Sequence, residues 1–426
     1  MSPDHPQVAF GRYSLTRRLA KGGMAELFLA LRRDNPRGGP VVVKRILPHF
    51  STELEFVKMF LNEARIAAQL AHPNIIQIFD LGQESGHFFL AMEFMDGHDL
   101  ESIAKKAGGT VPPLLAARIG AWLADALYYA NKNLNVIHRD VTPGNVMVNW
   151  SGMAKLVDFG IAKATDQLEK TRPGVVKGKF RYMSPEQISQ LELDGRTDLF
   201  SLGVLLYEIT TGQKPFERKQ ILQTLQAVQS YAPPPPHEVV PAIPEPLSRI
   251  IMRALEKNRD RRYRTGREMH GDLEEFLRTA PPVGPAEIAA FLRRLYPDSQ
   301  QVELITDPGL VQLPAELPTR PGREPLAPTD QIRSEDARRM LAEAERRHTR
   351  NQRAVEPPRP PQPALSPDEL NTSQMTVEEV RRQLNAIKSQ PAKPTPPPED
   401  WELRTGVLGP EELADVRENS GAKRLA

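Results

Sequence analysis

Two aspartates and an asparagine near the middle of the chain have the chemical types and the spacing needed to handle phosphate. Asp140 and Asn145 lie five residues apart in the run His-Arg-Asp-Val-Thr-Pro-Gly-Asn, and Asp158 follows eighteen residues after Asp140, in Asp-Phe-Gly. Carboxylate and amide oxygens suit Mg²⁺, and a carboxylate can also accept the proton of a hydroxyl nucleophile. Together these side chains could hold magnesium against a triphosphate beside a hydroxyl group.

Further motifs stand in a fixed order around this run. Upstream, a stretch of valines ending in Lys44 is typical of a buried strand, and apolar residues recur at helical spacing around Glu63. Downstream come Ser-Pro-Glu, which ends in Glu186, and an apolar run that begins at Asp198. In this order and spacing the motifs resemble those of the protein kinase family, and most closely those of the bacterial serine/threonine kinases of eukaryotic type.

The resemblance covers about residues 10–280 and implies a fold. It implies an α+β, two-lobed protein kinase fold, with a small antiparallel-sheet lobe at about 10–92, a hinge at 93–97 and a larger helical lobe at 98–280. Beyond it, the spacing of apolar residues predicts one appended helix within 281–298.

Composition changes sharply near residue 300. Of the 26 aromatic residues only Trp401 lies beyond that point, whereas 18 of the 41 prolines do. A segment with so few core-forming side chains cannot offset its chain entropy by burial, so we expect 299–426 to be a disordered, proline-rich tail. Two segments in it, 330–350 and 376–389, keep helical patterning, and each is either a transient helix or a docking site for a partner.

The bulk composition excludes several classes of protein. The 426 residues include no cysteine, which excludes disulfides and thiolate zinc sites and fits a reducing compartment. A formal net charge of +2 gives no reason to expect nucleic acid as a partner. Neither a signal-peptide pattern nor a membrane-spanning apolar run is present. We therefore expect a cytoplasmic protein, and the family resemblance implies that its partners are protein substrates.

By resemblance, the cofactors are ATP and Mg²⁺. Asp140 would be the catalytic base, and Asn145 and Asp158 would be the magnesium ligands. Lys44 would bind the α- and β-phosphates, and Glu63 would hold its ammonium group in place.

The family also implies where the nucleotide binds. Of the three glycines in the family's phosphate-covering loop, only Gly22 keeps its place here, because alanines stand at the first and third positions. Met92 takes the gatekeeper position before the hinge, whose backbone would bind the adenine edge, and Asp99 could reach the ribose. The nucleotide-binding residues implied in this way are Ala20, Lys21, Gly22, Gly23, Met24, Leu27, Lys44, Glu93, Met95 and Asp99.

Regulatory and structural roles follow from the same resemblance. Arg139 would pair with a phosphorylated residue of the activation loop, where Thr165 and Thr171 are the candidate autophosphorylation sites. The alternative is that both threonines are simply solvated loop residues. The structural residues implied are His138, which packs beside the loop, Asp198, which anchors it, and Glu186 and Arg262, which form an ion pair.

Two departures from the family pattern touch the active site. Thr142 stands where serine/threonine kinases usually carry lysine, and Lys179 stands where they usually carry threonine. Both therefore count among the predicted catalytic residues, on the hypothesis that Lys179 supplies the missing ammonium group. The leading interpretation is a serine/threonine kinase, and the alternative is a catalytically weak pseudokinase that acts as a scaffold through its tail. Tyrosine specificity is less expected, because residues 140–145 show no tyrosine-kinase pattern.

Overall fold

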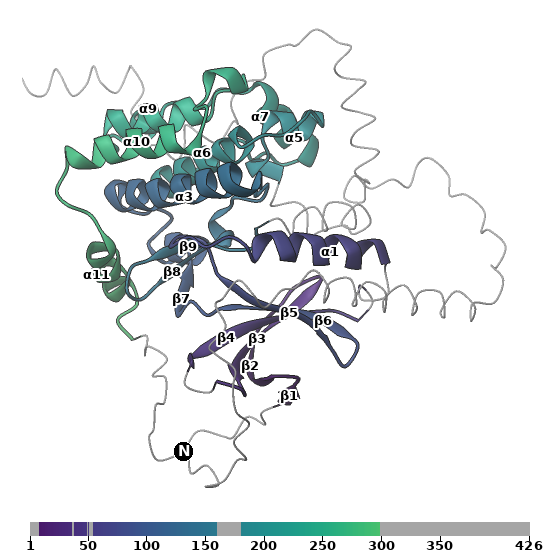
Figure 1. Cartoon of the computed structure of the whole chain (residues 1–426). Helices are drawn as coiled ribbons and strands as arrows, with labels where there is room; N and C mark the ends of the chain where they lie inside the picture. Colours follow the sequence, from purple (N-terminus) through teal and green to yellow (C-terminus); the bar gives the residue numbers. More distant parts are fainter. Residues whose placement is uncertain (1–7, 36–37, 49, 51–53, 160–179, 299–426) are drawn as a thin grey trace, which may run out of the picture. The chain divides into compact units, whose positions relative to one another are not determined.

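The computed structural model describes residues 8–35, 38–48, 50, 54–159 and 180–298. Figure 1 shows an antiparallel sheet with helix α1 (Leu54–Ala67) beside it, followed by a group of helices. This is the predicted α+β arrangement of a small sheet lobe and a larger helical lobe. The predicted tail lies outside the described residues. Within the described ranges, no helix has both the length and the apolar composition that crossing a membrane requires.

The main sheet has six strands, and every pair of neighbours is antiparallel. Its order is β1-β2-β3-β4-β6-β5, so only the last two strands depart from chain order. The strands are β1 (Val8–Phe10), β2 (Tyr13–Lys21), β3 (Ala25–Arg32), β4 (Pro40–Ile46), β5 (Ile78–Glu84) and β6 (His87–Glu93).

The valine run of β4 is buried on both faces of the sheet. Val42 belongs to the large core that includes the apolar face of α1, whereas Val41 and Val43 belong to a smaller core on the opposite face. Successive strand residues point to opposite faces, so a continuous apolar run fits a central strand that is covered on both sides. The same alternation places Lys44 on the face of Val42, toward α1.

The helical part is built around one buried helix. Nearly every residue of α6 is buried, and α3 and α9 pack against it, with α10 packed in turn on α3 and α9 (Figure 1). Glycines permit the close approach, since a Cβ on Gly120 would lie 2.9 Å from Leu206 and one on Gly203 would lie 2.8 Å from Ala254. The helices are α2 (Leu100–Lys106), α3 (Pro113–Leu134), α5 (Pro185–Ser189), α6 (Arg196–Thr211), α7 (Ile221–Ser230), α8 (Pro236–Val239), α9 (Glu245–Ala254), α10 (Gly266–Arg278) and α11 (Pro285–Leu295), with short 3-10 turns η3 (Pro143–Asn145), η5 (Phe180–Tyr182) and η6 (Arg259–Arg261).

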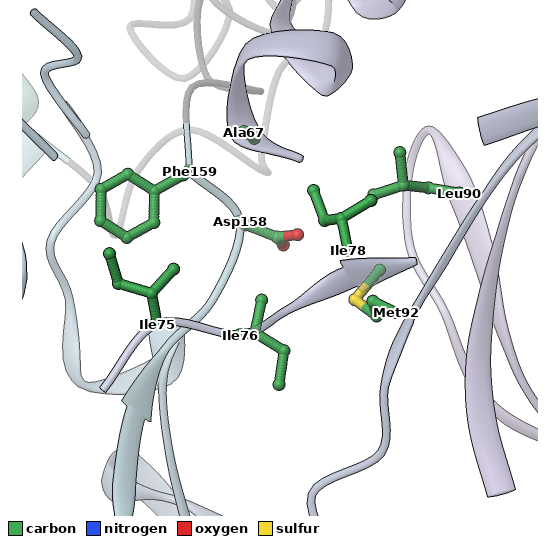
Figure 2. Close-up of a pocket in the computed structure, with 8 residues that line it drawn as sticks. All are labelled: Ala67, Ile75, Ile76, Ile78, Leu90, Met92, Asp158 and Phe159. Atoms are coloured by element: carbon green, nitrogen blue, oxygen red, sulfur yellow. The ribbon is translucent and has the colours of Figure 1, made fainter. Parts of the chain in front are cut away.

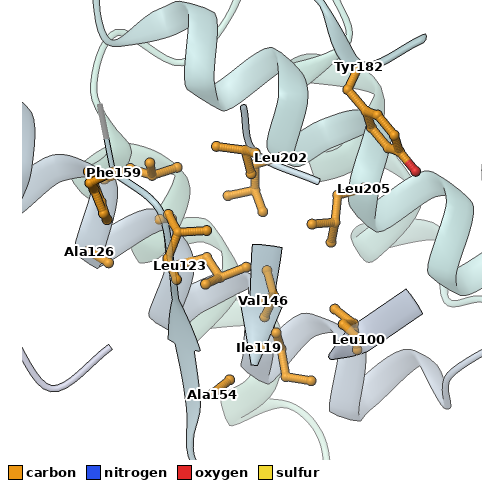
Figure 3. Packing of buried hydrophobic residues seen from close by; sticks show 14 of the residues in the cluster. Leu100, Ile119, Leu123, Ala126, Val146, Ala154, Phe159, Tyr182, Leu202 and Leu205 are labelled. Carbon is orange, nitrogen blue, oxygen red and sulfur yellow. The ribbon is translucent and has the colours of Figure 1, made fainter. Parts of the chain in front are cut away.

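The core of this part reaches the phosphate-handling motifs. Figure 3 shows side chains of α3, such as Leu123, close to Leu202 of α6, Val146 and Phe159. Val146 directly follows the Asp140–Asn145 run, and Phe159 directly follows Asp158. Burial of these two apolar neighbours therefore holds both motifs against the same core.

A second, three-stranded sheet brings the two motifs together. Its order is β7 (Gly97–Asp99), β8 (Val146–Asn149) and β9 (Ala154–Leu156), again antiparallel. Asn145 precedes β8 and Asp158 follows β9, and Val146 pairs with Leu156 at that end of the hairpin. Residues thirteen positions apart in sequence are thereby placed next to each other.

Candidate active site

The loop that carries Asp140 is anchored by a buried carboxylate. Asp198, at the start of α6 and 2% exposed, accepts hydrogen bonds from the backbone N–H of His138 (2.7 Å) and of Arg139 (2.8 Å). Burial raises the pKa of Asp198, against these hydrogen bonds, which lower it. Arg139 has a φ of 68°, a conformation that residues other than glycine seldom adopt. The anchor therefore stabilises a strained turn immediately before Asp140.

His138 lies inside the protein and orders the loop from within. Its Nδ1 accepts a hydrogen bond from the backbone N–H of Asp140 (3.2 Å), so its Nε2, 2.9 Å from the carbonyl of Val157, carries the donated proton. Its ring packs edge-on against Phe159, with centroids 4.6 Å apart. These contacts tie the Asp140 loop to the segment that carries Asp158, which is the structural kind of role that the sequence suggested.

Asp140 and Asn145 are in direct contact. The amide nitrogen of Asn145 donates to the backbone oxygen of Asp140 (2.7 Å) and to its Oδ2 (2.9 Å). The backbone oxygen of Asn145 accepts from Val157 N–H at 2.9 Å, next to Asp158. With its nitrogen directed at Asp140, the side chain of Asn145 has its amide oxygen to offer to a cation.

Lys44 reaches Asp158 from the sheet. Its Nζ lies 2.7 Å from Oδ1 of Asp158, with 14% of the lysine side chain and 37% of the aspartate side chain exposed. Asp158 itself has a φ of 62°, which places its carboxylate on a tight turn after β9. The predicted contact between Lys44 and Glu63 stays a prediction. The structure describes the backbone of Glu63, which lies in α1, but not its side chain.

An apolar pocket lies beside this ion pair. Figure 2 shows the carboxylate of Asp158 among apolar side chains that include Met92, which the sequence placed at the gatekeeper position. The lining residues are Ala67, Ile75, Ile76, Ile78, Leu90, Met92, Asp158 and Phe159. The pocket can therefore exclude water from one side of a charged site, which strengthens the electrostatic interactions there.

The β2–β3 turn carries the predicted phosphate-covering residues. Ala20 pairs with Leu27 across it, and Leu27 pairs in turn with Lys44, so the turn continues directly into the lysine strand. Gly22 donates to the carbonyl of Ala25 at 2.9 Å. A Cβ on Gly22 would make only an ordinary contact, and one on Gly23 would meet nothing within 4 Å. The turn itself therefore does not require either glycine. Because glycine has no side chain, the backbone on the outer side of the turn is left uncovered. Lys21 and Met24 lie in the same segment.

The hinge residues use their side chains for structure. The carboxylate of Glu93 accepts from Nζ of Lys155 at 2.7 Å, and its backbone N–H donates to the carbonyl of Gln77 at 2.9 Å, so a ligand at the hinge would use the carbonyl of Glu93 or the backbone of Phe94 and Met95. Asp99 begins α2 as its N-cap, because its two oxygens accept from the backbone N–H (2.8 Å) and the hydroxyl (2.7 Å) of Ser102. Sequence reasoning assigned Asp99 to the ribose and missed this cap, although an aspartate before a helical run is a standard signal for one.

Glu186 and Arg262 form a buried, two-pronged ion pair. The distances are 2.7 Å and 2.9 Å, and the two side chains are 4% and 0% exposed. Burial alone would raise the pKa of Glu186, but the hydrogen bonds and charge of Arg262 outweigh it and lower the pKa. Close by, Gln187 donates to the carbonyl of Arg139 at 3.1 Å and so links α5 to the Asp140 loop. Sequence reasoning did not identify Gln187.

The predicted residues divide into three groups. The structure brings Lys44, Asp140, Asn145 and Asp158 together, with His138, Arg139 and Asp198 supporting them. Thr142 is half-buried beside them, in extended backbone just before η3. Thr165, Thr171 and Lys179 lie outside the described residues, so the proposed exchange between Thr142 and Lys179 stays a hypothesis.

The donors present fit magnesium. An amide oxygen and a carboxylate are hard oxygen ligands, and the two residues that carry them are placed next to each other where the β8–β9 hairpin ends. In the part of the chain that the structure describes, no group of three or more His, Cys, Asp or Glu side chains gathers into a metal site. A cation held by Asn145 and Asp158 would therefore complete its shell with phosphate oxygens and water, as Mg²⁺ commonly does.

Comparisons with known proteins lead to the same family. The family model described as protein kinase domain matches residues 13–271. The chain is 40% identical over 319 residues to the tyrosine-protein kinase MasK of Myxococcus xanthus, covering 72% of this chain and 49% of MasK. It is 35% identical over 327 residues to the serine/threonine-protein kinase PknH of Mycobacterium bovis, covering 76% of this chain and 52% of PknH.

Solved structures agree. The kinase domain of Mycobacterium tuberculosis PknI is similar with a TM-score of 0.50 and 27% sequence identity, over 65% of this chain and 99% of that domain. The chain spans about half the length of the two curated relatives. Because the family model matches more than half of the chain, and the Lys44, Asp140, Asn145 and Asp158 constellation lies within that match, the chain belongs to the protein kinase family, in its bacterial, eukaryotic-like branch.

Proposed function

We propose that this chain is a serine/threonine protein kinase, which transfers the γ-phosphoryl group of ATP to hydroxyl groups of proteins. The observation that carries the proposal is that two contacting pairs, Lys44 with Asp158 (2.7 Å) and Asn145 with Asp140 (2.7 and 2.9 Å), are joined by the hydrogen bond from the Val157 N–H to the Asn145 carbonyl (2.9 Å). These are the base, the amide, the carboxylate and the ammonium group that phosphoryl transfer needs. The apolar pocket beside Asp158 supplies the low-dielectric wall.

Each side chain has one task in this proposal. Asp140, oriented by the amide of Asn145, accepts or directs the proton of the attacking hydroxyl. Lys44 places a positive charge where the α- and β-phosphates would lie. A magnesium ion held by Asn145 and Asp158 would offset the negative charge that develops on the phosphoryl oxygens. Anchoring of the loop by Asp198 keeps this geometry in place before substrate arrives.

The direct test is transfer of label from ATP. The purified chain, with γ-labelled ATP and magnesium, would be given four peptides that are identical except for one acceptor position, occupied by Ser, Thr, Tyr or Ala. We expect label on the Ser and Thr peptides and none on the Ala peptide. A folded chain that binds nucleotide but labels neither itself nor any peptide would instead support the pseudokinase alternative, in which the tail acts as the scaffold.

Tyrosine is the second candidate acceptor, for one reason. The relative MasK, at 40% identity, is described as a tyrosine-protein kinase, whereas PknH is described as a serine/threonine-protein kinase. The peptide series distinguishes serine/threonine specificity from tyrosine specificity. The site offers the same base to any hydroxyl, so the peptides differ only in how the acceptor approaches it. A faster rate on the Tyr peptide than on the Ser and Thr peptides would reverse the proposed specificity.

Control by the activation loop is part of the proposal. A phosphate on Thr165 or Thr171 would add nearly two negative charges that the guanidinium of Arg139 can bind. Replacing both threonines by alanine should lower kcat about tenfold, the scale of one charge-assisted hydrogen bond, without changing the affinity for Mg-ATP. The checks are peptide kinetics after preincubation with ATP and mass-spectrometric mapping of phosphate. Full activity of the double variant would leave Arg139 with only its backbone role beside Asp198.

Location and partners rest on composition. A cytoplasmic location fits a chain without cysteine. Beyond protein substrates, we propose that the segments 330–350 and 376–389 dock a partner through their apolar faces. After deletion of either segment, we expect a co-purifying protein to be lost while peptide kinase activity stays intact.

A further inference from the structure

Helix α11 is attached at a defined point of the active-site sheet. Gly152, in the β8–β9 turn, has a φ of +84°, and a Cβ there would lie 1.9 Å from the carbonyl oxygen of Pro285, the first residue of α11. Arg118 of α3 donates to the carbonyl of Val283 at 2.8 Å, just before the helix. The start of α11 therefore rests directly on the hairpin whose other end carries Asn145 and Asp158.

The residue that ends α11 completes an aromatic cluster. The ring of Tyr296 stacks on His98 of β7, with centroids 4.2 Å apart and planes 14° apart. Trp150, at the end of β8, packs edge-on against both rings, at 5.4 Å from His98 and 5.8 Å from Tyr296. Each pair lies within the range of separations at which aromatic rings attract beyond simple burial. Tyr296 thus contacts two strands of the small sheet at once.

The cluster continues into the hinge. The backbone N–H of Trp150 donates to the carbonyl of Asp96 at 3.0 Å, and its indole donates to the Asp96 carboxylate. On the other side, the hydroxyl of Tyr296 lies 3.4 Å from the carbonyl of Ser102, the residue whose N–H and hydroxyl are held by Asp99. Tyr296 therefore contacts Trp150, which is bonded to Asp96 in the hinge, and Ser102, which is bonded to the predicted ribose contact Asp99.

Tyr296 itself lies beyond the family match, which ends at residue 271, whereas the residues that it contacts lie within that match. We propose that Tyr296 is a positioning residue for nucleotide binding, which holds β7 and the start of α2 so that the hinge backbone and Asp99 keep the geometry a nucleotide needs. The inference rests on the proposed kinase function and extends it. Tyr296 acts through His98 and Trp150 and does not itself touch the nucleotide.

The test separates positioning from simple stabilisation. Binding of Mg-ADP to the full-length chain would be measured by titration calorimetry, with peptide kinetics alongside, for Tyr296→Ala, Tyr296→Phe and the control Arg294→Ala. Arg294 is an exposed residue of the same helix. We expect Tyr296→Ala to raise the Kd for Mg-ADP and the KM for ATP about fivefold, the scale of one lost aromatic pair, with kcat and the peptide KM within about twofold of the wild type. Tyr296→Phe keeps the stacked ring and should restore the wild-type Kd.

A second variant keeps the test decisive if Tyr296→Ala melts before it can be assayed. His98→Ala removes the other half of the stack and should raise the Kd by a similar factor. The double variant should raise the Kd by less than the product of the two single factors, because both changes remove the stack that the two rings share. An unchanged Kd in Tyr296→Ala or in His98→Ala, or the same loss in Arg294→Ala, would overturn the positioning role alone. A wild-type chain that binds no Mg-ADP would overturn the proposed function itself.

Discussion

Replacing Asp158 by asparagine is expected to lower kcat for phosphoryl transfer by a factor of about 10² to 10³ while the protein stays folded, since one preorganised charge contact is lost from a charge-stabilised transition state. The change removes a carboxylate that lies 2.7 Å from Lys44, and it removes one of the two proposed magnesium ligands. It alters almost no volume, so Phe159 and the core behind it should stay packed. The measurement is peptide phosphorylation over a magnesium titration, together with a melting curve.

A matched change elsewhere provides the control. Asp34→Asn makes the same chemical change on the surface, where the carboxylate pairs with Arg32 far from the catalytic loop in sequence. It should leave kcat and the magnesium dependence unchanged, because exposed ion pairs contribute little. Turnover of Asp158→Asn at the wild-type rate would remove Asp158 from the active site, whatever the result for Asp34.

Arg262→Met should cost the largest amount of stability of the substitutions considered, about 3–5 kcal/mol, because it leaves the carboxylate of Glu186 buried without its partner. The two side chains are 0% and 4% exposed and share two hydrogen bonds, so water cannot replace the lost arginine. A loss of this size corresponds to a melting temperature lower by roughly 6–10 °C. Arg249→Met is the control. The side chains of Arg249 and Glu245 form an ion pair but are 71% and 65% exposed, so this substitution should change the melting temperature by about 1 °C or less.

The pH dependence gives this prediction a second check. In the wild type the lowered pKa of Glu186 contributes stability above the ordinary carboxyl range, and this contribution is lost as the pH falls through the lowered pKa. In Arg262→Met the buried, unpaired carboxyl should have a raised pKa, so the variant loses stability as the pH rises through it. The difference in melting temperature between the two proteins should therefore be largest near neutral pH and shrink toward pH 4. A constant difference across that range would mean that lost packing, and not the stranded charge, is the cause.

Local pattern was sufficient to predict the elements that carry the site. The valine run before Lys44 predicted a buried strand, and β4 (Pro40–Ile46) is that strand. The apolar spacing beyond residue 281 predicted an appended helix, and α11 (Pro285–Leu295) is present. In both cases neighbours in sequence decide the outcome, since alternation or helical spacing of apolar residues is a local property.

Contacts that join distant segments could not be predicted in this way. Gln187 binds the carbonyl of Arg139, and Tyr296 stacks on His98, but polar and aromatic side chains of these types carry no mark of their partner in the sequence. The family motifs pointed to the proposed reacting groups because the spacing of such groups is fixed by the chemistry. The supporting contacts depend on how the helices pack, which no local pattern specifies.

The packing of the C-terminal helices also determines how far a stable fragment of this protein must extend. A fragment that stopped at residue 271, where the family match stops, would end inside α10 (Gly266–Arg278). It would leave the hydroxyl of buried Tyr263 without Asp272, Arg118 without Glu274, and α3 without the apolar cover of Leu273, Phe276 and Leu277. The span of the family model is therefore shorter than the set of helices that pack together, and a fragment meant for crystallisation or inhibitor screening should extend through residue 298.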